Sequence, residues 1–378
     1  MSAGSATGAT GTVLAPGARI RAEVDEEAVR LLAERLYGIS VQELTELPGY
    51  DDRNYRLTED PNVKNPLILR HSPHGYVLKI MNSMDSKNLA VVEAQNELMN
   101  FLSRRSVTCP VPVRNVFGQL HSLETLGGQQ HAVRLLEFVP GELLKDVPRS
   151  DALCYQLGEF VANLDNKLQN FTHSGLAGRE HIWMLSQVPE LEKFKYVIED
   201  PDNLDLVEEV IEEFKYAVVP QLGDLERGVI HGDINEQNVL VDRKPQPSNS
   251  EYRIAGIIDF GDVQESYYVF ELAIAMTYLM LLTGQPRSAG VLLAGYSVTR
   301  RLPDHEYRLL KTLVSARLVQ SLVLGAYTLQ QDPANTYVTC SARAGGWQLL
   351  RRLRKSPPQP DGDDTDWRAV ADEYLTRS

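Results

Sequence analysis

The sequence has 378 residues, of which 43% are hydrophobic, and 51 acidic against 38 basic residues give it a net charge of -13. This length exceeds the roughly 100–200 residues usual for one domain, so we expect two lobes or domains. An acidic chain repels phosphate backbones, which argues against nucleic acid as a partner. The widely spaced cysteines, Cys109, Cys154 and Cys340, argue against a disulfide framework and favour a reducing compartment.

The N-terminal segment 1–22 is rich in small residues and lacks the basic start and apolar core of a signal peptide. It predicts a disordered leader. A mitochondrial presequence, the alternative, would carry more arginine in an amphipathic pattern. The longest apolar run, residues 272–282, is shorter than the about 18 residues that a membrane span needs. The sequence therefore predicts a cytoplasmic protein without a membrane partner.

The next part of the chain, residues 23–140, predicts a small β-rich lobe. Helical spacing of apolar residues predicts a first helix over 25–38. The period then changes, and residues 41–59 alternate around Gly49, which predicts two strands joined by a tight loop. Two short β-rich runs around a Ser-Pro-His-Gly turn, one helix and two more strands complete the lobe: residues 66–82, 86–105, 110–118 and 131–141.

The rest of the chain predicts a large, mostly helical lobe over 141–355, followed by a linker and a short helix over 356–378. Two short strands, at 238–242 and 252–260, interrupt the helical pattern and are joined by a polar loop that we expect at the surface. The whole is an α+β fold of two lobes. The helical patterns of the large lobe cover residues 151–168, 204–218, 266–282, 304–329 and 342–353.

The segment 228–242, "GVIHGDINEQNVLVD", places polar side chains between two apolar strand-like runs. Asp233 and Asn238 lie in its loop, and Asp259 ends the partner strand. If the two strands pair as a hairpin, these three side chains converge at one end. Two carboxylates and an amide form an oxygen-only ligand set that suits Mg²⁺, and a nearby cation would offset the cost of burying carboxylates.

Phosphoryl transfer needs such a set. One aspartate takes the proton of the acceptor hydroxyl, while an Asn and a second Asp hold Mg²⁺ on the nucleotide phosphates. In the small lobe, Lys79 lies on a predicted strand, from which a lysine can reach phosphates and pair with a helix glutamate. Glu93 and Glu97 follow at i and i+4 on the next helix, and we favour Glu93 as the partner.

The pattern formed by His-Gly-Asp at 231–233, Asn238 and Ile-Asp at 258–259, with Val-Leu-Lys upstream, resembles the aminoglycoside phosphotransferase and choline kinase family. The resemblance covers about residues 41–324. It implies a protein-kinase-like fold, Asp233 as catalytic base, Asn238 and Asp259 as magnesium ligands, and Lys79 as the phosphate-binding lysine. It also implies that backbone groups hold the nucleotide, at Gly49 and Tyr50 for the phosphates and at Glu137 and Val139 for the base.

Four segments, 47–55, 92–102, 180–183 and 257–275, most resemble the branch of this family that acts on hydroxylysine. This resemblance implies transfer of the terminal phosphate of GTP, with ATP as the alternative donor, to the 5-hydroxyl of 5-hydroxy-L-lysine in hydroxylysine catabolism. Carboxylates would then attract the ammonium groups of the acceptor. The candidate substrate residues are Asp262 and Glu265, and Trp183, which either lines the acceptor pocket or packs internally.

Two departures from the family pattern leave the metal set intact but argue against a generic antibiotic kinase. Asn235 stands where many relatives have a histidine, and Glu271 stands where an aspartate is common. The alternatives are a kinase for another amino alcohol, such as choline, homoserine or an aminoglycoside, and a nucleotide-binding module without catalysis. His231 is interpreted as a structural residue that hydrogen-bonds the loop backbone.

Overall fold

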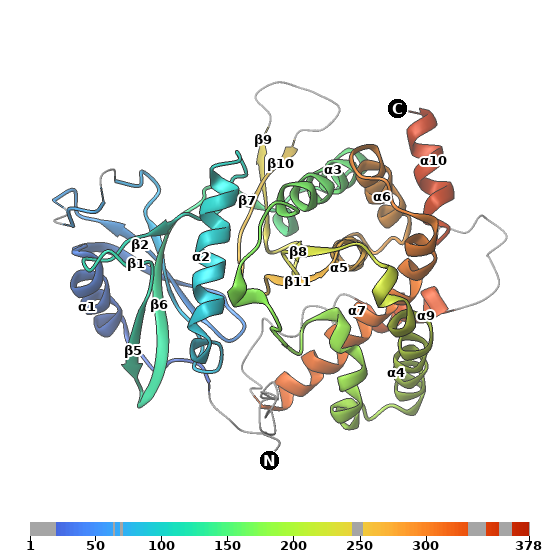
Figure 1. Cartoon of the computed structure of the whole chain (residues 1–378), viewed down its shortest axis with the longest axis horizontal. Helices are drawn as coiled ribbons and strands as arrows, with labels where there is room; N and C mark the ends of the chain where they lie inside the picture. The colour runs from blue at the N-terminus through green and yellow to red at the C-terminus, as the bar shows by residue number, and fades with distance from the viewer. Residues whose placement is uncertain are drawn as a thin grey trace, which may run out of the picture.

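The fold consists of a β-rich small lobe and a mostly helical large lobe (Figure 1), as the sequence predicts. Helix α2 lies on the side of the small lobe that faces the large lobe (Figure 1). The computed structural model describes residues 20–62, 65–68, 71–243, 252–331, 345–354 and 365–377.

The small lobe is built on a six-stranded antiparallel sheet in the order β1-β2-β3-β6-β4, with β5 paired to β6. Helix α1 (Glu26–Tyr37) begins at the side-chain cap of Asp25 and packs its apolar stripe on the sheet. The lobe therefore has a core of its own, in which α1 and the strands bury Leu36, Leu57, Leu78 and Leu135. The strands are β1 (Val41–Leu47), β2 (Arg53–Glu59), β3 (Tyr76–Ile80), β4 (Pro112–Val113), β5 (Ser122–Leu126) and β6 (Gln129–Glu137).

Two expectations for the small lobe need correction. Within the described part of the 66–82 segment, which lacks residues 69–70, only Tyr76–Ile80 forms a strand. The Asn65 side chain accepts the N–H of Leu67 and the Asn65 carbonyl accepts that of Ile68, which makes a turn at the start of the segment. The hairpin strand β5 has no counterpart in the predictions. The helix predicted over 86–105 is confirmed as α2 (Leu89–Ser103), which a short 3₁₀ turn precedes.

The large lobe surrounds two small sheets. Strands β9 (Val239–Arg243) and β10 (Tyr252–Ile257) form the predicted hairpin, which β7 (Glu142–Leu143) extends. Strands β8 (Arg227–Ile230) and β11 (Gln264–Tyr267) make the second sheet, although residues 266–267 were expected to be helical. The helices are α3 (Asp151–Leu168), α4 (Pro201–Glu213), α5 (Tyr268–Thr283), α6 (Arg287–Thr299), α7 (Asp304–Gln331), α9 (Gly346–Arg354) and α10 (Trp367–Arg377).

Helix α6 was not predicted, and its burial explains why. Its residues 288–296 are all buried, so they show no alternation of apolar and polar faces. The backbones of α3 and α6 touch, because a Cβ on Gly158 would come within 1.9 Å of the Leu292 carbonyl oxygen. The crossing therefore depends on glycine and not on an amphipathic stripe.

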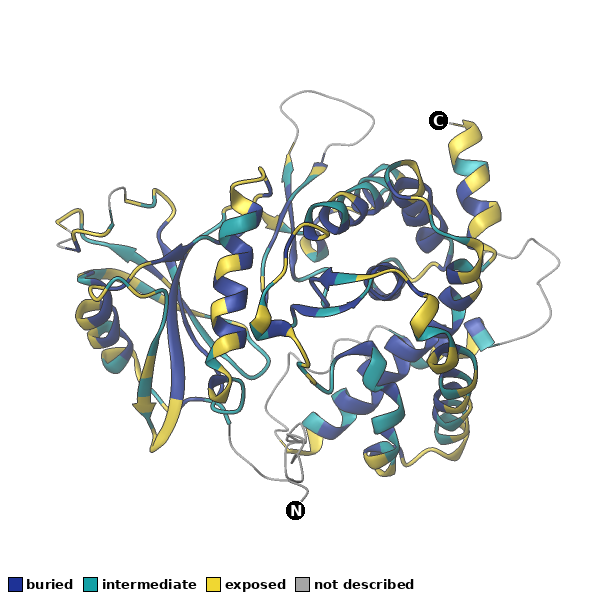
Figure 2. Ribbon diagram, in the orientation of Figure 1, coloured by how far each residue is buried: buried dark blue, intermediate teal, exposed yellow. Residues whose placement is uncertain are grey.

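Helix α7 is long and apolar enough to cross a membrane, but 83% of its most apolar window is buried inside the protein. It is drawn mostly in the colour of buried residues in Figure 2. We interpret it as the central core helix of the large lobe. The free cysteines Cys109 and Cys154 are also buried.

Some predicted segments lie wholly or mostly outside the described residues. These are the leader apart from residues 20–22, the loop 244–251, Cys340 and the linker apart from residues 365–366. The predicted helix over 342–353 is described from Gly346, and the expected C-terminal helix is α10.

Candidate active site

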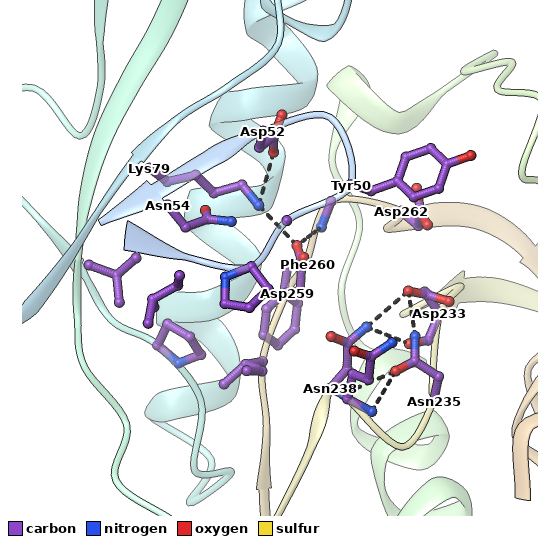
Figure 3. Close-up of a pocket in the computed structure, with 18 of the residues that line it drawn as sticks. Tyr50, Asp52, Asn54, Lys79, Asp233, Asn235, Asn238, Asp259, Phe260 and Asp262 are labelled. Carbon is purple, nitrogen blue, oxygen red and sulfur yellow. Dashed lines mark hydrogen bonds and ion pairs between the residues drawn. The ribbon is translucent and has the colours of Figure 1, made fainter. Parts of the chain in front are cut away.

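A cavity of about 470 Å³ lies between the two lobes, and most of the predicted site residues line it (Figure 3). One end is apolar and adjoins the connection between the lobes. The other end is rich in carboxylates and aromatic rings. The apolar end is formed by Leu47, Val77, Leu136, Phe138, Leu240 and Ile258, and the polar end by Tyr50, Asp51, Asp85, Trp183, Asp233, Asp262, Tyr278 and Arg317.

The loop after β8 is held in place by hydrogen bonds within the loop and to neighbouring elements. His231 Nε2 bonds to the carbonyl of Ile258 at 3.1 Å, and His231 Nδ1 accepts the N–H of Asp233 at 3.3 Å. The Gly232 N–H donates to the carboxylate of Glu271 at 3.0 Å, and Gly232 has a φ of 83°, in the left-handed region. The structural role predicted for His231 is confirmed by these bonds, and burial lowers its pKa and so favours the neutral ring.

The carboxylate of Asp233 is bound on both oxygens. Oδ2 accepts the side-chain amides of Asn235 and Asn238, each at 2.9 Å, while Oδ1 accepts one bond from Arg317 Nη2 at 3.0 Å. Since a carboxylate oxygen has two acceptor positions, Oδ1 keeps one for a further donor. Burial raises the pKa of Asp233 to about 6; nearby Asp262 adds to the rise and Arg317 opposes it.

Lys79 bridges two carboxylates of different elements. Its Nζ lies 2.9 Å from Asp52 Oδ2 and 3.1 Å from Asp259 Oδ1. Burial disfavours its charge, but the two carboxylates overcome this effect and hold the pKa of Lys79 above its ordinary value. Burial likewise acts to raise the pKa of Asp259, yet the charge of Lys79 brings it below its ordinary value.

The predicted pairing of Lys79 with Glu93, or with Glu97, is wrong in this structure. Both glutamates are exposed on α2, and Lys79 pairs with Asp52 and Asp259 instead. The orientation of α2 about its own axis points Gln95 into the protein, where its side-chain amide donates to the carbonyl of Gly261 at 3.0 Å. The i and i+4 spacing placed the glutamates on one face correctly but could not say which way that face points.

The side-chain oxygens of Asn238 and Asp259 are suitable ligands for a divalent cation. The Asn238 NH₂ group donates to Asp233, and among the described residues nothing donates to Asn238 Oδ1, so that oxygen is available to a metal. Asp259 carries a φ of 60°, which is unusual outside glycine and is often found at functional sites. In the described part of the chain no three His, Cys, Asp or Glu side chains form a metal cluster, so the protein would supply few ligands, as Mg²⁺ sites on nucleotide phosphates commonly do.

The far end of the cavity is walled by aromatic rings from both lobes. The Tyr50 ring of the β1–β2 loop meets the Trp183 ring edge-on with centroids 5.7 Å apart, and its hydroxyl hydrogen-bonds Thr328 of α7. Trp183 lines the cavity and also packs against Tyr50.

The carboxylates at the polar end of the cavity are only partly compensated by nearby positive charges. Burial raises the pKa of Asp51 to about 7, and Asp52 and Asp85 add to the rise. Burial raises the pKa of Asp262 to about 6, which Arg179 and Arg317 offset only in part. His181 lies 3.7 Å from Asp262, but burial lowers the pKa of His181 to about 4, so it adds no charge near neutral pH. A cation that binds at the polar end of the cavity would stabilise the ionised form of these aspartates over the protonated form.

The other predicted residues fall into two groups. Gly49, Glu137 and Val139 line the cavity. A Cβ on Gly49 would come within 2.7 Å of the Asp52 carbonyl oxygen, so the tight loop needs glycine there. Glu265 was expected near the substrate but is absent from the lining; it lies on β11 and pairs with Arg227 at 3.6 Å, because alternate strand residues point to opposite faces.

Sequence reasoning missed Asp52, Arg134 and Arg317 at this site. Asp52, from the β1–β2 loop, pairs with Lys79 at 2.9 Å. Arg134 lies opposite Lys79 in the β3–β6 register and is buried. The sequence does give an indication for Arg317, because it is the single charged residue between Thr312 and Gln331, in the mainly apolar part of its helix.

The fold and this constellation of groups define a small-molecule kinase of the protein-kinase-like class. The chain belongs to the phosphotransferase enzyme family (APH), whose family model matches residues 43–308. It is 34% identical over 366 residues to the hydroxylysine kinase of Xenopus laevis, covering 93% of this chain and 94% of that protein. It is also 28% identical over 214 residues to the homoserine kinase of Methylobacillus glycogenes, covering 56% of this chain and 61% of that protein.

Among solved structures, the chain resembles the amicoumacin kinase hAmiN, determined with AMP-PNP, Ca²⁺ and Ami. The TM-score is 0.62 at 16% sequence identity, and the match covers 93% of this chain and 94% of that one, which shows a common fold. Together with the hydroxylysine kinase relatives, the family membership makes this protein a phosphotransferase with an alcohol acceptor.

Proposed function

We propose that this protein transfers the terminal phosphate of GTP to the 5-hydroxyl of 5-hydroxy-L-lysine, with Mg²⁺ as cofactor. The observation that carries the proposal is the juxtaposition of Asp233, with one free acceptor position on Oδ1, and the incompletely neutralised aspartates Asp51 and Asp262 in one cavity. An acceptor with both a hydroxyl and ammonium groups matches this arrangement. The 34% identity to the Xenopus laevis hydroxylysine kinase, over 93% of the chain, supports the same acceptor.

The proposed roles follow from the positions of the side chains. Asp233 Oδ1 takes the proton of the attacking hydroxyl. Asn238 and Asp259 hold Mg²⁺, which offsets charge on the phosphates. Lys79, which is bound between two carboxylates here, is the cation that contacts the phosphates, together with backbone amides of Gly49 and Tyr50.

The apolar end of the cavity takes the nucleotide base in this proposal. The N–H of Glu137 is already bonded to the carbonyl of Val111, and within the described residues the N–H of Val139 donates to no backbone carbonyl. The base would therefore meet the Glu137 carbonyl and the Val139 amide. GTP as donor rests on the resemblance to hydroxylysine kinases, and ATP remains the alternative.

The acceptor end is assigned by charge. Asp262 and Asp51 attract the ammonium groups, and Trp183 with Tyr50 walls the carbon chain. Homoserine is the second candidate acceptor, because a homoserine kinase is among the relatives. A cytoplasmic location is part of the proposal and agrees with the free, buried state of Cys109 and Cys154.

The acceptor proposal is tested by phosphate transfer from GTP and from ATP to a panel of 5-hydroxylysine, lysine, homoserine and choline. We expect 5-hydroxylysine to have the highest kcat/KM, GTP to exceed ATP, and lysine, which lacks the hydroxyl, to receive no phosphate. Phosphorylated lysine would contradict hydroxyl transfer, and a higher kcat/KM for homoserine would replace the acceptor. Nucleotide binding without transfer to any member would favour a module without catalysis.

The pH dependence of kcat/KM is a second expected result. Asp233 must be ionised to accept a proton, and its raised pKa of about 6 places the loss of activity there as the pH falls. We therefore expect kcat/KM to fall as the pH drops through the range of about 7 to 6, in which Asp51 and Asp262, the proposed acceptor carboxylates, also become protonated. Rates measured between pH 4.5 and 8.5 check this, and a rate that stays constant down to pH 4.5 would exclude Asp233 as the base.

A further inference from the structure

Arg317 of α7 is a buried cation directly behind the proposed base. Only 1% of its side chain is exposed, and its Nη2 donates to Asp233 Oδ1 at 3.0 Å. Among described residues its Nε has no hydrogen-bond partner. Burying a guanidinium is costly, and the mid-helix position in an apolar run gives no reason for it other than its partners.

The position of the guanidinium is determined by several contacts. Its Nη1 donates to the Trp183 carbonyl at 2.9 Å and to Gln320 Oε1 at 3.0 Å. The rings of Trp183 and Tyr278 flank it, with centroids 5.4 and 5.3 Å away. Gln320 in turn donates to the carbonyls of Ile182 and Met184, at 2.8 and 3.0 Å. One helix thus ties residues 182–184 to the carboxylate of Asp233.

Arg317 borders the cavity but offers it little surface. Only 1% of its side chain is accessible, against 23% of the Asp233 side chain, so an acceptor in the cavity meets mainly Asp233. The two asparagine amides bind Oδ2, so Arg317 determines where the remaining oxygen lies. A planar guanidinium with several fixed donors holds a carboxylate oxygen more narrowly than an ammonium could.

We propose that Arg317 is a positioning residue for phosphoryl transfer: it holds Asp233 Oδ1 toward the acceptor hydroxyl and joins this base to the Trp183 wall. The inference rests on the proposed function, because it needs Asp233 as the base.

The test uses the full chain with the variants Arg317→Gln and Arg317→Lys, alone and combined with Asp233→Asn. Arg300→Lys is the matched control, because Arg300 is also buried, paired with Glu226 and stacked on Tyr268, but lies outside the cavity. The readouts are kcat and KM for GTP with 5-hydroxylysine as acceptor, for proteins shown by thermal melting to be folded at the assay temperature.

For Arg317→Gln we expect kcat to fall about 100-fold with KM for GTP within about twofold, since a misplaced base costs rate and not nucleotide binding. In the Asp233→Asn background the same change costs nothing further, because Arg317 acts through Asp233. If Arg317→Gln does not fold, Arg317→Lys decides: it lowers kcat about tenfold and leaves KM for GTP within about twofold.

Any of three results for the Arg317 variants would overturn the inference alone: a wild-type kcat in Arg317→Gln, a full multiplicative loss in the double variant, or a wild-type kcat in Arg317→Lys when Arg317→Gln is unfolded. A wild-type protein that does not phosphorylate 5-hydroxylysine, or an Asp233→Asn variant of full activity, would instead reject the proposed function on which the inference rests. A loss in Arg300→Lys equal to that in Arg317→Lys would reduce the effect to general packing and also overturn it.

Discussion

Asp233→Asn is expected to lower kcat for 5-hydroxylysine by about 10³-fold, within the range that general-base catalysis contributes. The amide has almost the same size and cannot take the hydroxyl proton. Nucleotide binding should stay within about twofold, because Asp233 faces the acceptor end of the cavity. The measurement is steady-state transfer from GTP, together with the dissociation constant of GTP.

The control for this variant must separate chemistry from stability. The substitution leaves Arg317 without its carboxylate, and an unpaired buried charge destabilises a fold. Thermal melting should therefore show a lower midpoint but a folded protein at the assay temperature. Asp242→Asn changes a partly exposed aspartate of β9 that pairs with Arg253 outside the cavity, and it should keep the wild-type kcat. A folded Asp233→Asn protein with more than one-tenth of the wild-type kcat would reject the base assignment.

Asp259→Asn has the second large expected effect, a loss of about 10³-fold in kcat/KM together with a weaker response to Mg²⁺. A bound metal contributes several kcal/mol to charge stabilisation in the transition state, and each 1.36 kcal/mol is a factor of ten in rate. The measurement is the rate as a function of Mg²⁺ concentration. Removal of the metal from the wild-type assay with EDTA should lower the rate at least as much.

Asp52→Asn provides the matched control, because Asp52 and Asp259 both pair with Lys79 but only Asp259 belongs to the proposed metal set. We expect Asp52→Asn to keep the wild-type Mg²⁺ dependence, even if KM for GTP rises through the altered surroundings of Lys79. An Asp259→Asn protein with an unchanged Mg²⁺ response, or an Asp52→Asn protein that loses it, would contradict the assignment of Asp259 as a metal ligand.

The local parts of the site could be predicted from the sequence. Asp233 and Asn238 are five residues apart in the loop before β9, and Asp259 follows β10, which pairs with β9. A single hairpin is therefore enough to place the three side chains in one cavity. The polar positions between apolar strand-like runs carried the prediction. The same locality explains why α3 was predicted with its observed bounds, since its apolar stripe repeats with the helical period.

The contacts between residues far apart in the chain could be seen only in the tertiary structure. Because α2 is oriented with Glu93 toward solvent, Lys79 pairs with Asp52 instead. Because side chains alternate along β11, Glu265 points toward Arg227. Arg317 is 84 residues from Asp233, and no local pattern connects the two. Sequence periodicity specifies which residues share a face, whereas the direction of that face depends on packing against elements elsewhere in the chain.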